Sequence, residues 1–136
     1  PLILLYETDL LHFKQSMYPA VQFIAQGFEN LELDQHFDLV FCMNAINHVQ
    51  DIEKSMDVLV SKMESGGHLV ISIDAHTHTI FKHIFRLLPG DVLHPHQYDL
   101  NEYQNMLTSR NCTLVTTELL KHEFFFDHYL LIAKKN

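Results

Sequence analysis

Apolar residues cluster along this chain in short runs that alternate with periodically patterned segments, which predicts strands separated by helices. Runs rich in branched and aromatic residues indicate strands. The predicted strands are Val21–Ala25, Phe37–Met43, Leu69–Ile73, Thr113–Thr117 and Tyr129–Ala133. Phe37–Met43 is apolar almost throughout, a pattern typical of a strand that is buried on both faces. Leu2–Tyr6 is an ambiguous sixth segment that fits either a strand or part of a helix.

The strongest helical pattern covers Asp51–Glu64. Its apolar positions fall on one face of a helix with 3.6 residues per turn. Asp51 has the side chain of a good N-cap, and we expect the pair Gly66-Gly67 to end the helix.

Two further segments show helical spacing. Asp99–Arg110 begins with an aspartate that Glu102 follows three residues later, which predicts a capping box. Thr79–Leu88 carries apolar residues over more than half of its circumference and stops at Pro89-Gly90. That second helix fits a core element, a lid over an apolar substrate or a dimer face.

Alternating strands and helices predict an α/β sandwich with a largely parallel sheet. The length of 136 residues suits a single domain over residues 1–136. No helical segment separates the last two predicted strands, so we expect them to pair as an antiparallel hairpin.

Charge and composition exclude several classes of function. The formal net charge of −8 and a pI of about 5.7 argue against binding to nucleic acid or to an anionic membrane. No apolar run approaches the roughly 18 residues that cross a bilayer, and no signal peptide is visible. The two cysteines fall in strand-like segments, which predicts reduced core thiols in a cytoplasmic protein.

One continuous stretch resembles a known family. It comprises Phe37-Asp38-Leu39-Val40, a turn ending in His48-Val49, the Asp51–Glu64 helix, and Ser65-Gly66-Gly67-His68-Leu69-Val70-Ile71-Ser72. This arrangement resembles the central part of a class I S-adenosylmethionine-dependent methyltransferase of the type 11 group. Upstream and downstream segments extend the resemblance over nearly the whole chain.

The resemblance implies a Rossmann-like fold, S-adenosylmethionine as cofactor and a small-molecule methyl acceptor. The family's sheet runs in the order 3-2-1-4-5-7-6, and this chain offers equivalents of strands 3 to 7. Strands 1 and 2 and the glycine-rich cofactor loop would precede Pro1, and none of the four glycines forms a G-x-G pattern. The sequence therefore predicts a partial methyltransferase domain, or alternatively an inactive remnant that serves as a binding or dimerisation module.

The strand at Phe37–Met43 would pair with the family's strand 1, so here it becomes a sheet edge. An apolar edge strand promotes association. Three arrangements follow from this: the chain is a partial copy of a longer enzyme, Leu2–Tyr6 fills the gap, or two chains form a homodimer through the open edge. The absence of an initiator methionine before Pro1 favours a processed, trimmed or partial chain.

Two turns carry the candidate cofactor-binding residues. Asn44 and Ala45 follow the Phe37–Met43 strand, and ligands in open α/β sheets bind outside the carboxyl ends of strands. The alternative is that Asn44 only caps the turn. Glu29, Asn30 and Leu31 resemble the family's adenine-side turn, with Leu31 placed to pack on the adenine face, or they form a plain surface turn.

The sequence supports a catalytic residue less strongly than it supports the cofactor-binding residues. His48 is a weak candidate for a general base, because imidazole titrates near neutral pH, and it also fits a helix-entry residue. Asp74 ends the Leu69–Ile73 strand and faces the expected cleft, or it is an ordinary loop carboxylate.

Eleven histidines invite a metal interpretation. His76-x-His78 and His94-x-His96 form two closely spaced pairs, and zinc requires three or four ligands. Pro95 disturbs the geometry of the second pair, and both pairs lie in predicted loops. We therefore expect no functional metal.

Overall fold

The computed structural model describes residues 15–24, 26–77, 96 and 98–136. The regular elements in these ranges are η3 (Gln15–Met17), η4 (Phe28–Asn30), β1 (Phe37–Cys42), η5 (Ile46–His48), α1 (Ile52–Ser61), β2 (Met63–His76), α3 (Leu100–Thr108), β3 (Cys112–His122) and β4 (Phe126–Lys135). The predictions for Leu2–Tyr6 and Thr79–Leu88 lie outside the described residues.

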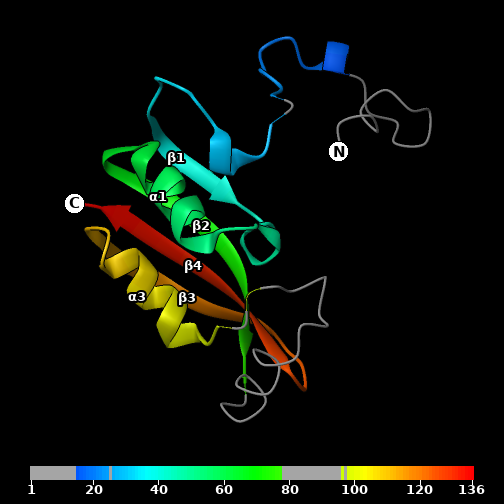
Figure 1. Cartoon of the computed structure of the whole chain (residues 1–136), viewed down its shortest axis with the longest axis vertical. Helices are drawn as coiled ribbons and strands as arrows, with labels where there is room; N and C mark the ends of the chain where they lie inside the picture. Colours follow the sequence, from blue (N-terminus) through cyan, green and yellow to red (C-terminus); the bar gives the residue numbers. More distant parts are fainter. Residues whose placement is uncertain (1–14, 25, 78–95, 97) are drawn as a thin grey trace.

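The described strands form one sheet in the order β1-β2-β4-β3 (Figure 1). β1 and β2 are parallel, whereas β2 pairs with β4, and β4 with β3, in antiparallel fashion. The predicted hairpin of the last two strands is thus confirmed. The prediction of a largely parallel sheet is wrong for the strand pairs described. β1, β2 and β3 run in the same direction, but β4 lies between β2 and β3 and is antiparallel to both.

The predicted strand at Val21–Ala25 is not formed by residues 21–24. Val21 instead donates its backbone N–H to the carbonyl of Tyr18 at 3.0 Å, and the side chains of Val21 and Ile24 are exposed. A strand exists through pairing with a neighbour, so an apolar run without a paired neighbour remains irregular. The described residues therefore supply equivalents of four strands rather than five.

The first predicted helix is confirmed as α1, with Asp51 accepting the N–H of Lys54 at 3.0 Å. Its end and the role of the glycine pair differ from expectation. α1 ends at Ser61, and Gly66-Gly67 lie inside β2. Gly66 has a φ of +82°, and a Cβ on Gly67 would lie 3.0 Å from the carbonyl oxygen of Phe37. Gly67 therefore permits the close approach of β1 and β2, whereas Gly66 supplies a left-handed backbone conformation.

The second predicted helix is confirmed as α3, including its capping box. The Asp99 side chain accepts the N–H of Glu102 at 3.0 Å, and the Glu102 side chain accepts the N–H of Asp99 at 2.8 Å. Both α1 and α3 cover the same face of the sheet (Figure 1). Cys42 and Cys112 are free thiols buried in the resulting core, as the sequence predicted.

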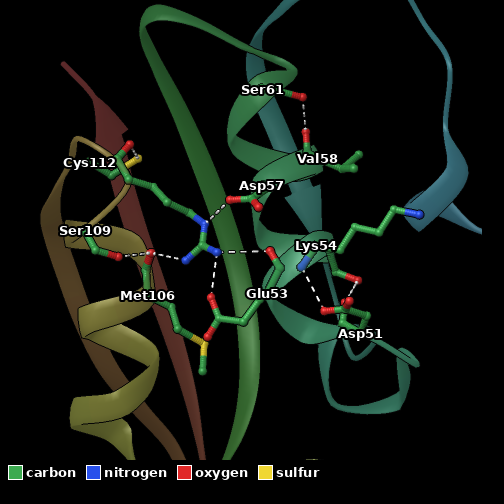
Figure 2. Close-up of polar contacts among 11 residues, drawn as sticks. Asp51, Glu53, Lys54, Asp57, Val58, Ser61, Met106, Ser109 and Cys112 are labelled. Carbon is green, nitrogen blue, oxygen red and sulfur yellow. Dashed lines mark hydrogen bonds and ion pairs between the residues drawn. The ribbon is translucent and has the colours of Figure 1, made fainter.

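A cationic contact joins the two helices. Arg110, just beyond α3, donates to the carboxylates of Glu53 at 2.6 Å and Asp57 at 2.7 Å. The same guanidinium donates to the carbonyl of Met106 at 2.9 Å. Figure 2 shows Glu53 and Asp57 on α1 facing the end of α3 that carries Met106. Ion pairing thus fixes the two helices side by side over the core.

β1 departs from its sequence pattern. Among the described residues it pairs with β2 alone, and it is not buried on both faces as predicted. The side chain of Phe41 is 62% exposed, and Phe37, Leu39 and Met43 are exposed as well. The continuous apolar run is therefore a sheet edge, as the resemblance implied. Within the described ranges no helix has the length and apolar character needed to cross a membrane.

Candidate cofactor and acceptor site

The carboxyl ends of β1 and β2 meet at one edge of the sheet. Asn44 follows β1 with a left-handed φ of 50° and donates its backbone N–H to the hydroxyl of Ser72 at 2.6 Å. Ala45 is half-buried and packs against the core. The turn after β1 is therefore held against β2, at the place where open α/β sheets bind ligands.

The turn of Glu29, Asn30 and Leu31 is attached to the start of α1. The Glu29 carboxylate accepts the N–H of Asp51 at 2.8 Å, and Lys54 donates to the Asn30 side chain at 2.9 Å. These polar side chains fasten η4 to the helix. They line a polar hollow of about 570 Å³.

Leu31 faces a different space. It lines an apolar groove of about 360 Å³ together with Ala45, Phe28 and Met43, which runs along the open edge of β1. Two predicted site residues from distant segments, Leu31 and Ala45, are thus brought together. The apolar walls suit the flat faces of an adenine ring, so the residues present fit that end of the cofactor. The described residues include no glycine-rich loop for its methionyl end.

The other predicted residues fall into two environments. His48 lies exposed on η5, and its position on that short helix makes it part of the turn after β1. Asp74 is buried near the end of β2, only 8% exposed. Among the described residues no group of three potential metal ligands comes together, and His76 instead packs against the ring of Phe126 at a centroid distance of 4.4 Å. His78 and His94 lie outside the described residues.

A buried set of hydrogen bonds around the side chain of Asn47 lies at the same edge and was not predicted. We call this set the polar bracket. The Asn47 side chain accepts the backbone N–H of Asp74 at 3.1 Å and donates both to its carbonyl and to the Tyr103 hydroxyl, each at 2.9 Å. Burial, followed by the charge of Asp74, raises the pKa of Tyr103 above its usual range. An asparagine beside the His48-Val49 turn was the available sequence signal, but nothing in the sequence indicates its distant partners.

Asp74 also contacts a residue that sequence reasoning missed. His128 on β4 lies directly opposite Asp74, and its Nδ1 is 2.5 Å from the Asp74 carboxylate. The Nε2 atom of the same ring is 3.5 Å from the Glu123 carboxylate. The pairing depends on the register of β2 and β4, which the sequence does not reveal.

Comparison with known proteins agrees with this geometry. Residues 7–71 match the model of a family described as a methyltransferase domain. The chain is 30% identical over 100 residues to the mitochondrial ubiquinone biosynthesis O-methyltransferase of Dictyostelium discoideum, a match that covers 65% of this chain and 30% of that protein. The chain is thus similar to methyltransferase domains, over residues 7–71 for the family model and over 100 residues for that relative.

Solved structures show the same class I methyltransferase fold. Magnesium protoporphyrin IX methyltransferase from Synechocystis PCC 6803, with bound SAH, superposes with a TM-score of 0.62 at 20% identity, over 94% of this chain and 55% of that one. The N-methyltransferase NodS from Bradyrhizobium japonicum WM9 gives a TM-score of 0.65 at 17% identity, over 88% and 57%. The chain thus spans just over half of those structures and under a third of the curated relative.

The family's strand order places the described sheet within the fold. The order β1-β2-β4-β3, with its antiparallel last strand pair, corresponds to strands 4-5-7-6 of the class I methyltransferases. The Rossmann-like architecture predicted from the sequence is confirmed as a partial form of that fold.

Proposed function

We propose that this chain forms the C-terminal part of a catalytic domain that transfers a methyl group from S-adenosylmethionine to a small-molecule acceptor. The strand order β1-β2-β4-β3 carries the proposal, because it sets the carboxyl ends of the parallel strands β1 and β2 at one edge. The methyltransferase-domain match over residues 7–71 supports the same assignment.

In this proposal Leu31 and Ala45 contact the adenine ring, and Asn44 borders the reacting centre at the end of β1. Glu29 and Asn30 hold the turn that carries Leu31 in place through their contacts with α1. The cofactor supplies an activated methyl group on a sulfonium centre. The chain's own task is to align the acceptor with that group and to exclude water, which accounts for most of the advantage in such a displacement.

The buried, reduced thiols are consistent with a cytoplasmic location. The acidic net charge gives no support to nucleic acid as a partner.

Calorimetric titration of S-adenosylhomocysteine into the intact 136-residue chain tests this function. We expect micromolar affinity in the wild type and a loss of about tenfold or more in A45L, because the added side chain fills the groove beside Leu31. V115L is the matched control, since Val115 is an exposed apolar residue of β3 that does not line the groove. Its affinity should stay within about twofold of wild type.

A folded chain that gives no binding heat would contradict the cofactor site. That outcome would favour the alternative of a non-catalytic module, which the exposed apolar edge of β1 supports. In that case a homodimer through β1 is the expected assembly, and sedimentation velocity would detect it as a species of twice the chain mass.

A further inference from the structure

The turn after β1 begins where the hydrogen-bonded ladder between β1 and β2 ends. The last paired residues of that ladder are Cys42 and Ile71. Ser72 is the next residue of β2, and its side-chain hydroxyl accepts the backbone N–H of Asn44 at 2.6 Å. The hydroxyl thus satisfies a backbone donor at the point where the chain leaves the sheet, beyond the reach of the ladder itself.

Asn44 has a backbone conformation that most residues avoid. Its φ of 50° lies in the left-handed region, where the Cβ of an ordinary residue comes too close to the following carbonyl oxygen. Glycine adopts this conformation without steric cost, and asparagine tolerates it better than alanine does. An asparagine at this position therefore suits the shape of the turn, whatever its side chain contacts.

The left-handed residue stands between two residues of the apolar groove. Met43 and Ala45 both line that groove, whereas Asn44 does not. A strand continued past Met43 would carry Ala45 about 7 Å farther along the strand axis, beyond the end of the paired ladder. The turn at Asn44 instead leaves Ala45 half-buried in the groove that Leu31 also lines. The place of Ala45 in the groove thus depends on the backbone of Asn44.

A second contact to β2 holds the far end of the same turn. The side chain of Asn47 accepts the N–H of Asp74 at 3.1 Å and donates to its carbonyl at 2.9 Å. Ile46, between the two attached residues, is fully buried in the core. The turn is therefore fastened to β2 near both of its ends, and Ala45 lies between these attachments.

The side chain of Asn44 allows two explanations of its role. It is exposed, and its amide forms no hydrogen bond to another of the described residues. Either the amide contacts a ligand directly, or the residue acts through its backbone by placing Ala45. The first explanation requires the amide, whereas the second requires only a residue that accepts the left-handed conformation. The bond to Ser72, which uses the backbone N–H, favours the second.

We propose that Asn44 and Ser72 are positioning residues of the cofactor site. They hold the turn after β1 so that Ala45 packs against the adenine ring of the cofactor. Asn44 contributes its left-handed backbone, and Ser72 contributes the hydroxyl oxygen that accepts the N–H of Asn44. This inference rests on the proposed function.

Two substitutions of Asn44 that both remove the amide separate the explanations. Calorimetry with S-adenosylhomocysteine on the intact chain should show that N44A binds about fivefold or more weakly than wild type, because alanine opposes the left-handed conformation. N44G should bind at least about fivefold more tightly than N44A, because glycine accepts it. Should N44A fail to fold, N44S makes the same comparison, since serine also lacks the amide and is not favoured in this region.

Asn111 provides the matched control. It also has a left-handed φ, of 60°, but it lies in the turn between α3 and β3 and does not line the groove. N111A should lower stability in urea denaturation, as N44A does, and leave the affinity of the folded chain for S-adenosylhomocysteine within about twofold of wild type. Affinity is compared at a temperature at which every variant is folded, so a loss of stability alone does not change it.

The hydroxyl of Ser72 is tested in the same titration. S72A removes the acceptor of the Asn44 N–H, and we expect a loss of affinity of about fivefold or more, as in N44A. S72T keeps a hydroxyl at that position and should bind at least about fivefold more tightly than S72A. Wild-type affinity in S72A, or an equal loss in S72T, would overturn the role of the hydroxyl.

The remaining results separate this inference from the proposed function. Wild-type affinity in N44A, or equal losses in N44G and N44A, would overturn the role of the Asn44 backbone while the proposed function stands. A loss in N111A as large as that in N44A would show a general effect on the fold and would overturn it as well. A folded wild-type chain that binds no S-adenosylhomocysteine removes the proposed function and this inference together.

Discussion

At the scale of single residues, Asn47 makes more buried hydrogen bonds at the site than any residue named from the sequence. Its side chain satisfies two backbone groups of Asp74 and the hydroxyl of Tyr103 in a buried environment. The predicted residues Glu29 and Asn30 proved to hold a turn against α1, whereas Leu31 and Ala45 meet in one groove. Sequence spacing identified the turns, but side-chain partners far apart along the chain depend on packing.

Removing the Asn47 side chain should strongly destabilise the fold. N47A leaves three buried polar groups without their partner, and we expect the free energy of unfolding to fall by about 2–4 kcal/mol. Urea denaturation measures the difference. Q50A removes an exposed amide from the same loop and should change stability by less than about 0.5 kcal/mol. Equal losses in both variants would contradict the role of the bracket.

The Cys42 thiol should be unreactive in the native protein. Burial raises its pKa to about 11, so at pH 8 only about one thiol in a thousand is the reactive thiolate. We expect alkylation by iodoacetamide at Cys42 only after denaturation, read out by peptide mass spectrometry. S61C places a thiol at an exposed position of α1 and provides the reactive reference. Rapid native labelling of Cys42 would show that the core around β1 opens.

At the scale of elements, sequence reasoning succeeded where the signal is local. The N-cap Asp51 and the capping box of Asp99 and Glu102 use contacts within one turn, and both are present. The strand at Val21–Ala25 and the mostly parallel sheet were wrong, because strand formation depends on distant neighbours. Gly66-Gly67 were interpreted as a helix stop, although Gly66 serves a left-handed conformation within β2 and Gly67 the close approach to β1.

The Arg110 contact makes a prediction at this scale. R110A removes the bonds that join α3 to Glu53 and Asp57, and we expect a loss of about 1–2 kcal/mol, limited because both carboxylates are largely exposed. Thermal denaturation at 50 mM and 1 M NaCl should show a smaller loss at high salt, since salt screens the pairs. K134A removes an exposed cation as a control. A salt-independent loss would point to packing alone.

At the scale of the whole molecule, the open edge of β1 governs association. The net charge of −8 opposes contact between copies near pH 7. Because histidine as a residue type gains a proton in the range below neutral pH, lowering the pH toward 6 weakens that repulsion in a histidine-rich chain. With less repulsion, the exposed apolar side chains of β1 can contact a second copy of the chain more readily. The sequence predicted this edge through the family's strand order, and it could not show which side chains would be exposed.

F41K should suppress self-association as the pH is lowered. A lysine on an edge strand opposes pairing with another strand, and Phe41 is mostly exposed, so stability should change little. Sedimentation velocity at pH 7.5 and 6.2 measures the oligomers. V115K changes an exposed apolar residue on the other outer strand, β3, and should associate like the wild type. Equal suppression by both variants would attribute the effect to charge alone.

The inner and outer strands of the sheet should also differ in the rate at which their amide protons exchange. β2 and β4 have hydrogen-bonded neighbours on both sides, whereas β1 and β3 each have one among the described strands. Amide protons in the middle of β2 and β4 can exchange with deuterium only when the sheet opens as a whole, while outer-strand amides exchange through local fraying. The protein therefore preserves the pair of Ile71 and Leu131, which lie across from each other in the middle of these two inner strands, through fluctuations that expose the remainder of the sheet.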